Sequence, residues 1–424
     1  MLIALVILIF LFLFTSVPIF ISLSLASFIA IVLFSDTQPM ILVQRLFAGI
    51  DQFSLMALPF FIFAANLMDG GGLSSRILKL AKALVGHLTG GIAMTTQVAS
   101  MFFGALSGSA PATVVAIGKI MYPEMLRGGY GRGFSSSLIA SAGAVSLVIP
   151  PSITLIIFGA VTGVSVSSLF IAGIGAGLFL GLSSLLYIYI YAKKNKLPRD
   201  PKATGKELLN SAISAGWALM IPVIILGGIY TGLFSPTEAA GISVVYAILV
   251  GLFIYKELTL RKIIDISIDS AITSAQVLVL VAAAQILGWV LTRARLPQMV
   301  VEFITNNITS MIVFLLILNL ILLVMGMFME GVASIIVVAP LIYQSAISLG
   351  VDPVHLGIIM ITNLALGMYT PPFGMNIFVS QSLSEVKLKE MLPFIGKFLC
   401  FNVAALLIIT YVPDLSLFLV RFLG

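Results

Sequence analysis

Long uncharged apolar runs alternate with short polar stretches along the whole of this 424-residue chain. The first 34 residues contain no charge, and about 20 apolar residues are enough to cross the hydrocarbon core of a bilayer. Runs near or above that length occupy residues 1–34, 53–69, 88–118, 133–165, 167–192, 212–232, 236–255, 271–291, 308–345, 354–383 and 389–413. The sequence has none of the alternating short strands that a membrane barrel needs. The pattern therefore predicts an all-α polytopic membrane protein with about ten or eleven crossings.

Composition agrees with this interpretation, because 60% of the residues are hydrophobic and only 9% are charged, which excludes a water-soluble globule. A cleaved signal peptide is the alternative for the first run. That run has no basic region before it, is too long and lacks a convincing cleavage site, so we expect it to be retained. Cys400 is the single cysteine, which excludes an internal disulfide. His87 and His355 have no carboxylate or cysteine at ligand spacing, so we expect no transition-metal site.

The net charge of +6 arises from Lys and Arg residues that cluster between apolar runs, a distribution typical of membrane orientation rather than of nucleic-acid binding. The longest polar insertion is "KKNKLPRDPKATGK", residues 193–206, with six basic residues. The positive-inside rule places it in the cytoplasm. The segment "RILKLAKALVGH", residues 76–87, alternates basic and apolar residues at helical spacing. It indicates either an amphipathic helix at the membrane interface or a charged collar on a spanning helix.

Interruptions of the apolar pattern occur twice in the same order. "SGSAPATVV" at 107–115 resembles "FMEGVASII" at 328–336, and "VIPPSI" at 148–153 resembles "YTPPFG" at 369–374. Ala112 and Ala333 are 221 positions apart, as are Pro150 and Pro371. Upstream, "SVPIFIS" from Ser16 resembles "FSPTEAA" from Phe234.

We therefore predict two inverted repeats, over 1–192 and 207–424, joined by a basic cytoplasmic connection at 193–206. Inversion requires an odd number of crossings in each half, so the N-terminus would lie outside if the connection lies inside.

Each predicted repeat contains two kinds of interruption. A Pro-Pro pair removes two amide donors, which predicts helix breaks at 148–152 and 369–373. The small and polar stretches predict re-entrant helical hairpins near 101–118 and 326–345. Irregular backbone is tolerated at membrane depth only where it is buried in protein or lines a cavity, so these segments predict a site for an anion and for Na⁺. Close helix packing is the alternative explanation for such small residues.

A carboxylate within an apolar run is costly and suggests function, as for Glu330 in "LVMGMFMEGVASIIVV". A partner for a hidden arginine, or a protonated and hydrogen-bonded acid, is the alternative. Arg293 and Arg295 follow an apolar run and either extend to an interface or pair with an inward carboxylate. Glu238 is expected to cap a helix that begins after Pro236.

Four motifs together resemble the large membrane subunit (DctM-like, M subunit) of tripartite ATP-independent periplasmic (TRAP) transporters. They are "SGSAPATVVAIGKIMYPEM", "VIPPSITLIIFGAVTGVSVSSLFIAGI", "FSPTEAAGISVVYAILVG" and "YTPPFGMNIF", and the resemblance extends over nearly the whole chain. It implies an elevator-type, sodium-driven secondary transporter of the bacterial inner membrane. Its implied partners are a small four-helix membrane subunit and a periplasmic binding protein that delivers an organic acid. The overall look of the sequence favours sialic acid over C4-dicarboxylates.

The resemblance also implies site residues. The first sodium site would be formed by Ser107, Ser109, Gly143, Val148 and Pro150, and the second by Gly326, Glu330, Gly367, Thr370 and Phe373. The substrate would lie near Ser107, Ser109, Glu330 and Arg293. Because Ser109 aligns with Glu330, the two sites need not be equivalent. The four extra helices of fused versions are absent, so the small subunit is expected to be a separate polypeptide.

Three functions remain to be compared. Sodium-coupled uptake within a tripartite system is the first hypothesis, and a stand-alone anion symporter of the same fold is the second. A membrane enzyme ranks last, because the sequence has no cluster of Asp, His and Cys of the kind that catalysis requires. No cofactor other than Na⁺ as coupling ion is expected.

Overall fold

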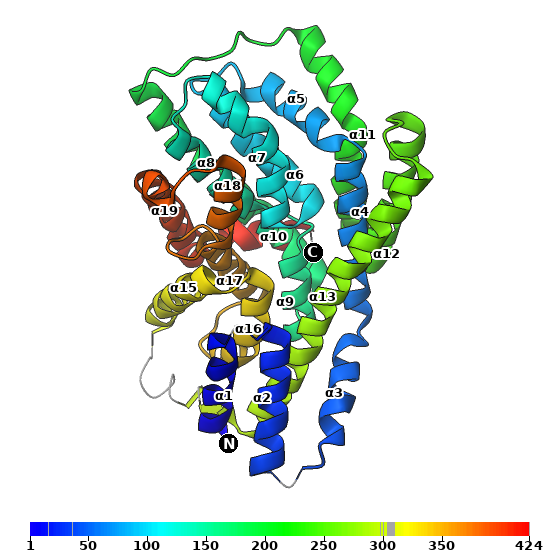
Figure 1. Cartoon of the computed structure of the whole chain (residues 1–424), viewed down its shortest axis with the longest axis vertical. Helices are drawn as coiled ribbons and strands as arrows, with labels where there is room; N and C mark the ends of the chain where they lie inside the picture. The colour runs from blue at the N-terminus through cyan, green and yellow to red at the C-terminus, as the bar shows by residue number, and fades with distance from the viewer. Residues whose placement is uncertain (16, 36, 297, 300, 303–309, 424) are drawn as a thin grey trace.

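The computed structural model describes residues 1–15, 17–35, 37–296, 298–299, 301–302 and 310–423, and every regular element within them is helical (Figure 1). Seven of the described helices are long and apolar enough to cross a membrane. They are α10 (Val166–Lys194), α11 (Gly205–Tyr230), α12 (Pro236–Leu249, extended by a π-helical turn to Ile254), α13 (Leu260–Arg293), α15 (Met311–Phe328), α16 (Gly331–Ser348) and α19 (Leu388–Tyr411). The all-α polytopic prediction is confirmed.

The first apolar run was predicted as one segment, and this is wrong. It forms two helices, α1 (Leu2–Phe14) and α2 (Ile19–Phe34), that pack against each other. Pro18 precedes α2 and has no amide hydrogen to continue the helical ladder, so the run divides there. Ser16, where the upstream repeat motif begins, lies outside the described residues.

A scaffold is built from α1, α2, α3 (Met40–Ile50), α4 (Ala57–Gly70), α11, α12 and α13. The long helix α13 runs through it and packs against α2, α3 and α4, while α12 packs against α4 (Figure 1). The helix start predicted after Pro236 is confirmed. The backbone N–H of Ser235 donates to Glu238 Oε2 at 2.8 Å, and the backbone N–H of Glu238 donates to Ser235 Oγ at 3.3 Å.

A pair of helices joined by a short turn lies at each place where a hairpin was predicted, and each pair is longer than the sequence indicated. The first consists of α6 (Gly91–Ser107) and α7 (Ala110–Arg127), and the second of α15 and α16. Apolar arms of this length gave no signal for where the hairpin begins, because an arm and a crossing helix have the same composition. The tips, at 107–109 and 329–330, lie inside the predicted ranges.

Each hairpin is followed by a helix that is interrupted at the Pro-Pro pair. The first is α8 (Arg132–Ala144) with a short 3₁₀ turn, η2 (Val145–Leu147), and then α9 (Ile153–Thr162). The second is α17 (Pro353–Gly367) followed by α18 (Met375–Ser384). Segments of the two predicted repeats, 1–192 and 207–424, pack against each other. The helix α18 packs against α7 and α8, and α9 packs against α16 and α17.

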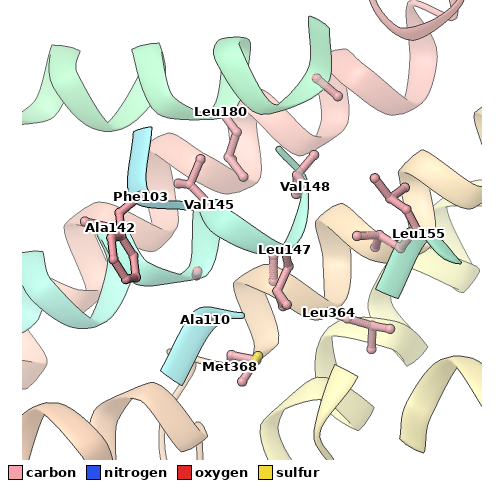
Figure 2. Packing of buried hydrophobic residues seen from close by; sticks show 14 of the residues in the cluster. Phe103, Ala110, Ala142, Val145, Leu147, Val148, Leu155, Leu180, Leu364 and Met368 are labelled. Carbon is pink, nitrogen blue, oxygen red and sulfur yellow. The ribbon is translucent and has the colours of Figure 1, made fainter. Parts of the chain in front are cut away.

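The centre of the molecule is an apolar core around the first break. Figure 2 shows Leu147 in this core together with Ala110, at the start of α7, and Met368, just after α17. All three side chains are buried. The turn η2, which carries Leu147, contacts both α7 and α17, so the first break packs on the first hairpin and on the second interrupted helix.

The basic segment at 76–87 belongs to a separate helix, α5 (Leu73–Val85), whose 13 residues extend about 20 Å and cannot cross the bilayer core. Its apolar face packs against α6 and α11. At its two ends Arg76 pairs with Glu257 at 2.7 Å, and Lys82 pairs with Asp200 at 3.2 Å. This geometry favours the amphipathic interpretation over the charged collar.

The predicted orientation can be checked by cysteine labelling in a Cys400→Ser background. Leu2→Cys is expected to react with a membrane-impermeant maleimide in intact spheroplasts, whereas Lys196→Cys should react only after permeabilisation. The expectation follows from the basic connection and from the position of the N-terminus at the opposite end of the molecule (Figure 1). Labelling of Leu2→Cys only after permeabilisation would contradict it.

Candidate functional site

The first hairpin tip lies directly on the first helix break. A Cβ on Gly104 would lie 2.6 Å from Ser146 Cβ, and one on Gly108 would lie 2.8 Å from the carbonyl oxygen of Pro151. Gly108 has a φ of +58°, which allows the chain to turn between α6 and α7. Gly143 faces the start of α7, since its Cβ would lie 3.1 Å from the carbonyl oxygen of Ala110. Close backbone contact therefore fixes the tip.

Ser107 and Ser109 flank this turn. Ser107 Oγ is 3.1 Å from Thr113 Oγ1, and the Thr113 hydroxyl donates to the carbonyl oxygen of Ser109 at 2.8 Å. Ser109 precedes α7 with extended backbone, and within the described residues its hydroxyl makes no hydrogen bond to cap that helix. The N-terminus of α7 therefore keeps donors available for an anion.

At the first break, side-chain hydroxyls donate hydrogen bonds to a backbone carbonyl oxygen that has no helical partner. Ser152 Oγ donates to the carbonyl oxygen of Leu147 at 2.6 Å, and Thr154 Oγ1 donates to the same oxygen at 3.1 Å. Val148 and Pro150 pack on the side of the break that faces α10, because a Cβ on Gly173 would lie 2.6 Å from the Val148 carbonyl oxygen and 3.4 Å from Pro150 Cδ.

The second tip is seated on the second break in a similar way. Gly326 and Gly367 cross backbone to backbone, since a Cβ on Gly367 would lie 2.5 Å from Gly326 Cα. Phe328 and Phe373 lie with ring centroids 5.3 Å apart. The Thr370 hydroxyl donates to the carbonyl oxygen of Leu366 at 2.7 Å. Gly367, Thr370 and Phe373 come from the two sides of the second break, and Gly326 and Phe328 come from the end of α15, the first arm of the second hairpin.

Glu330 precedes α16 at the second tip and is exposed at the protein surface. Its backbone carbonyl oxygen accepts a hydrogen bond from the backbone N–H of Ser334 at 3.0 Å. Its carboxylate makes no hydrogen bond or ion pair within the described part of the chain, so the structure places no arginine beside it there. Its carboxylate stands at the same position in the second hairpin as the Ser109 hydroxyl does in the first.

The two tip-and-break assemblies meet. A Cβ on Gly331, next to Glu330, would lie 3.4 Å from Thr154 Cγ2 at the start of α9. On the other side, Asn376 at the start of α18 donates from Nδ2 to the carbonyl oxygen of Ala140 in α8 at 3.0 Å. Gly331 and Thr154 are 177 positions apart and Asn376 and Ala140 are 236 positions apart, so segments distant in the chain form one interlocked centre.

A cavity of about 420 Å³ lies between the first tip and the scaffold. Its hairpin side includes Ser107 and Ser109, and its scaffold side includes Asn66 and Asp69 of α4 and Thr273 of α13. The sequence reasoning missed these three scaffold residues. Asn66 and Asp69 are polar and three positions apart at the end of an apolar run, but nothing in the sequence shows that α4 lies beside the tip.

Arg293 does not lie beside Ser107, Ser109 or Glu330, the other residues predicted to bind the substrate. It ends α13, twenty residues after Thr273, which is about 30 Å along a helix axis. Its neighbour Thr292 lines a different cavity of about 640 Å³ together with Pro340 of α16. Pro340 is ten residues after Glu330, about 15 Å along α16. Arg293 therefore lies away from both tips in this structure.

A family model described as "Tripartite ATP-independent periplasmic transporter, DctM component" matches residues 6–415. The chain belongs to this family. The large permease proteins DctM of the C4-dicarboxylate TRAP transporters of Pseudomonas aeruginosa and Vibrio cholerae are 40% and 41% identical to it. Each match covers 95% of this chain and 94% of the relative.

Another relative differs in length and in the cargo named for it. The isethionate TRAP transporter permease protein DctMQ of Oleidesulfovibrio alaskensis is 40% identical over 95% of this chain but over only 64% of its own length. Among solved structures, the YdaH transporter of Alcanivorax borkumensis matches with a TM-score of 0.59 and covers 88% of both chains. At 13% identity that similarity concerns the fold alone.

The chain is thus a large permease component of a TRAP transporter and a multi-pass protein of the bacterial inner membrane. Its relatives are transport permeases, which agrees with the expectation that the chain is not an enzyme.

The close glycine contact at the second tip can be tested by substitution. Gly367→Ala is expected to destabilise the permease by about 1–3 kcal/mol, because the added methyl group meets the Gly326 backbone and neither helix can move aside cheaply. The measurement is the apparent Tm of the purified permease in detergent. Gly396→Ala is the matched control, since no atom lies within 4 Å of its Cβ position and alanine favours helix. Equal Tm values for the two variants would contradict the expected role of this contact.

Proposed function

We propose that this permease couples the entry of Na⁺ to the uptake of a small organic acid that a periplasmic binding protein delivers. The observation that carries the proposal is the meeting of two hairpin tips and two helix breaks beside a cavity that the scaffold closes. Interrupted helices at membrane depth provide carbonyl oxygens for a hard cation and helix N-termini for an anion. A monoanion that enters with two or more Na⁺ carries net positive charge inward, so uptake would be electrogenic.

The two cation positions proposed are those expected from the sequence. The first lies at Ser107, Ser109 and Gly143, where the tip contacts the break. The second lies at Gly326, Gly367 and Thr370, with Glu330 as the carboxylate. The Val148 carbonyl oxygen and the Pro150 ring face α10, so these two groups are not among the ligands proposed for the first position.

An organic acid fits the cavity beside Ser107 and Ser109. None of the described residues that line it is Lys, Arg or His, so a carboxylate there would be held by helix N–H groups, hydroxyls and bound Na⁺. Relatives named for C4-dicarboxylate and for isethionate are equally identical to this chain, so overall identity does not choose the cargo. Succinate and N-acetylneuraminate are the acids to test first.

An elevator mechanism and inverted repeats are part of the proposal. The hairpins and interrupted helices form one interlocked body, which meets the scaffold where α4 packs on α6 and α9 and where α13 packs on α16. A body that moves as a unit against α4 and α13 would expose the cavity to one side at a time. A small four-helix membrane subunit is part of the proposal as the partner of this permease.

Uptake by the reconstituted complex tests this function. Proteoliposomes with the permease, the small subunit and the binding protein are expected to accumulate labelled succinate or N-acetylneuraminate under an inward Na⁺ gradient and not under an equal K⁺ gradient. Glu330→Gln should raise the Na⁺ concentration for half-maximal uptake on the order of tenfold, because it removes a charged oxygen ligand. Ser109→Ala should raise it less, because a neutral hydroxyl is lost.

Arg293→Ala is the matched control for these variants. It also removes a polar group from the membrane region, but its position away from both tips predicts uptake close to that of the parent. Equal uptake with and without Na⁺ would overturn the sodium-coupled mechanism. Equal uptake without the binding protein and the small subunit would support the stand-alone symporter instead.

A further inference from the structure

A groove of about 690 Å³ lies on the scaffold between α2, α3 and α13. Both α2 and α3 pack on α13 but have little contact with each other, which leaves the groove between them (Figure 1). Its walls include Phe20 and Phe28 of α2 and Val43 and Leu46 of α3. Among the described residues that line it, Ser24 alone has a polar side chain. The groove therefore suits an apolar occupant.

A cationic side chain lies next to this groove. Arg45 is exposed on α3, within the turn that carries the groove residues Leu42 and Leu46. Its guanidinium makes no ion pair or hydrogen bond with the residues that the structure describes. An unpaired charge is costly in a bilayer, so an arginine on a lipid-facing helix extends to the headgroup region and pairs there.

Arg45 lies toward the membrane surface that is opposite the basic connection. The end of α4 at Gly70 and the whole of α5 lie on one side, because α5 is too short to cross the bilayer core. The basic connection lies on that side too, since the backbone N–H of Asp200 donates to the carbonyl oxygen of Gly86 at 3.1 Å. From there α4 and α3 lead back over residues 70–40, about 45 Å along a helix axis, which is enough to cross. Arg45 is in the second turn of α3 and therefore reaches the headgroups of the opposite leaflet.

We propose that the groove binds an acyl chain of an anionic phospholipid whose phosphate pairs with Arg45. Guanidinium and phosphate form paired, charge-assisted hydrogen bonds, and a headgroup without an ammonium leaves this attraction unopposed. A methylene group takes up about as much space as a water molecule, about 30 Å³, so the groove is large enough for an acyl chain. The lipid thus matches both the apolar walls and the adjacent charge.

The side chains of the groove favour a lipid over a docked transmembrane helix. Helices associate within membranes mainly through Gly, Ala, Ser and Thr, which let the two backbones approach closely. The exposed positions of this groove are mostly large, as at Phe20, Phe28 and Val43. A flexible acyl chain follows such a surface without close backbone contact.

Lipid binding to the purified full-length permease tests the proposal. The protein is titrated in detergent with dioleoylphosphatidylglycerol or with dioleoylphosphatidylcholine, and native mass spectrometry gives the Kd of the first lipid bound. The parent is expected to bind phosphatidylglycerol about threefold to tenfold more tightly than phosphatidylcholine, because one arginine pairs with the anionic headgroup. The measurement involves no transport, so its result is independent of the function proposed above.

Two kinds of substitution separate the headgroup from the groove. Arg45→Gln is expected to remove the preference for phosphatidylglycerol, whereas Arg45→Lys keeps the charge and should keep most of it. Ala275→Trp places a large side chain at an exposed position that lines the groove, and it should raise the Kd of both lipids at least about fivefold. Ala271→Trp is the matched control, because Ala271 is exposed one turn earlier on α13 and does not line the groove.

Equal Kd values for the two lipids in the parent would overturn the inference. So would equal Kd values for Ala275→Trp and Ala271→Trp, which would place the bound lipid elsewhere. An apparent Tm close to that of the parent verifies that each variant is folded, and the exposed positions of Arg45 and Ala275 predict that it is. The titration is then repeated on the complex with the small membrane subunit. Loss of the tight phosphatidylglycerol site there would show that the subunit, not a lipid, fills the groove.

Discussion

The structure depends on one constraint, which is that backbone groups freed inside a membrane protein must find partners within the protein. At the first break the carbonyl oxygen of Leu147 receives hydroxyl hydrogens from both Ser152 and Thr154. At the second break the backbone N–H of Asn376 donates to the carbonyl oxygen of Met368 at 2.8 Å. Helices can therefore stop at the centre of the molecule without exposing unpaired groups to lipid, and the donors and acceptors that remain can face a ligand.

Glycines that lie against neighbouring backbone fix the position of each hairpin tip on its helix break. Gly104 packs on Ser146, and Gly326 packs on Gly367. Each hairpin arm therefore lies closer to the following interrupted helix than it could if the glycine carried a side chain. Packing and binding were alternatives for the small residues in the sequence. In the structure they are compatible, because the packing of glycine against the break is what holds the tip where a ligand could reach it.

The sequence predicted the parts of the site that depend on local chemistry. Each Pro-Pro pair removes two successive amide donors, and a helix is interrupted at each, at Pro150 and at Pro371. The equal spacing of these prolines from Ala112 and Ala333 indicated the duplication. The sequence could not predict what depends on long-range neighbours. Asp69 and Asn66 line the cavity only because α4 passes beside the first hairpin. The division of the first run at Pro18 was visible in the sequence but was outweighed by the uninterrupted apolar composition around it.

The two hairpins share a geometry but present different groups. The first tip offers the Ser109 hydroxyl to a cavity that the scaffold closes, and the second offers the Glu330 carboxylate at an exposed position. Gly331 packs on Thr154, so the second tip also rests on the helix that follows the first break. A neutral tip beside an acidic one suits the proposed transport of Na⁺ together with an organic anion. A cation near Glu330 would offset the charge of its carboxylate, which would otherwise repel an anion at Ser109. Binding of the two ions would then be mutually favourable, and neither site would be strong in the absence of the other.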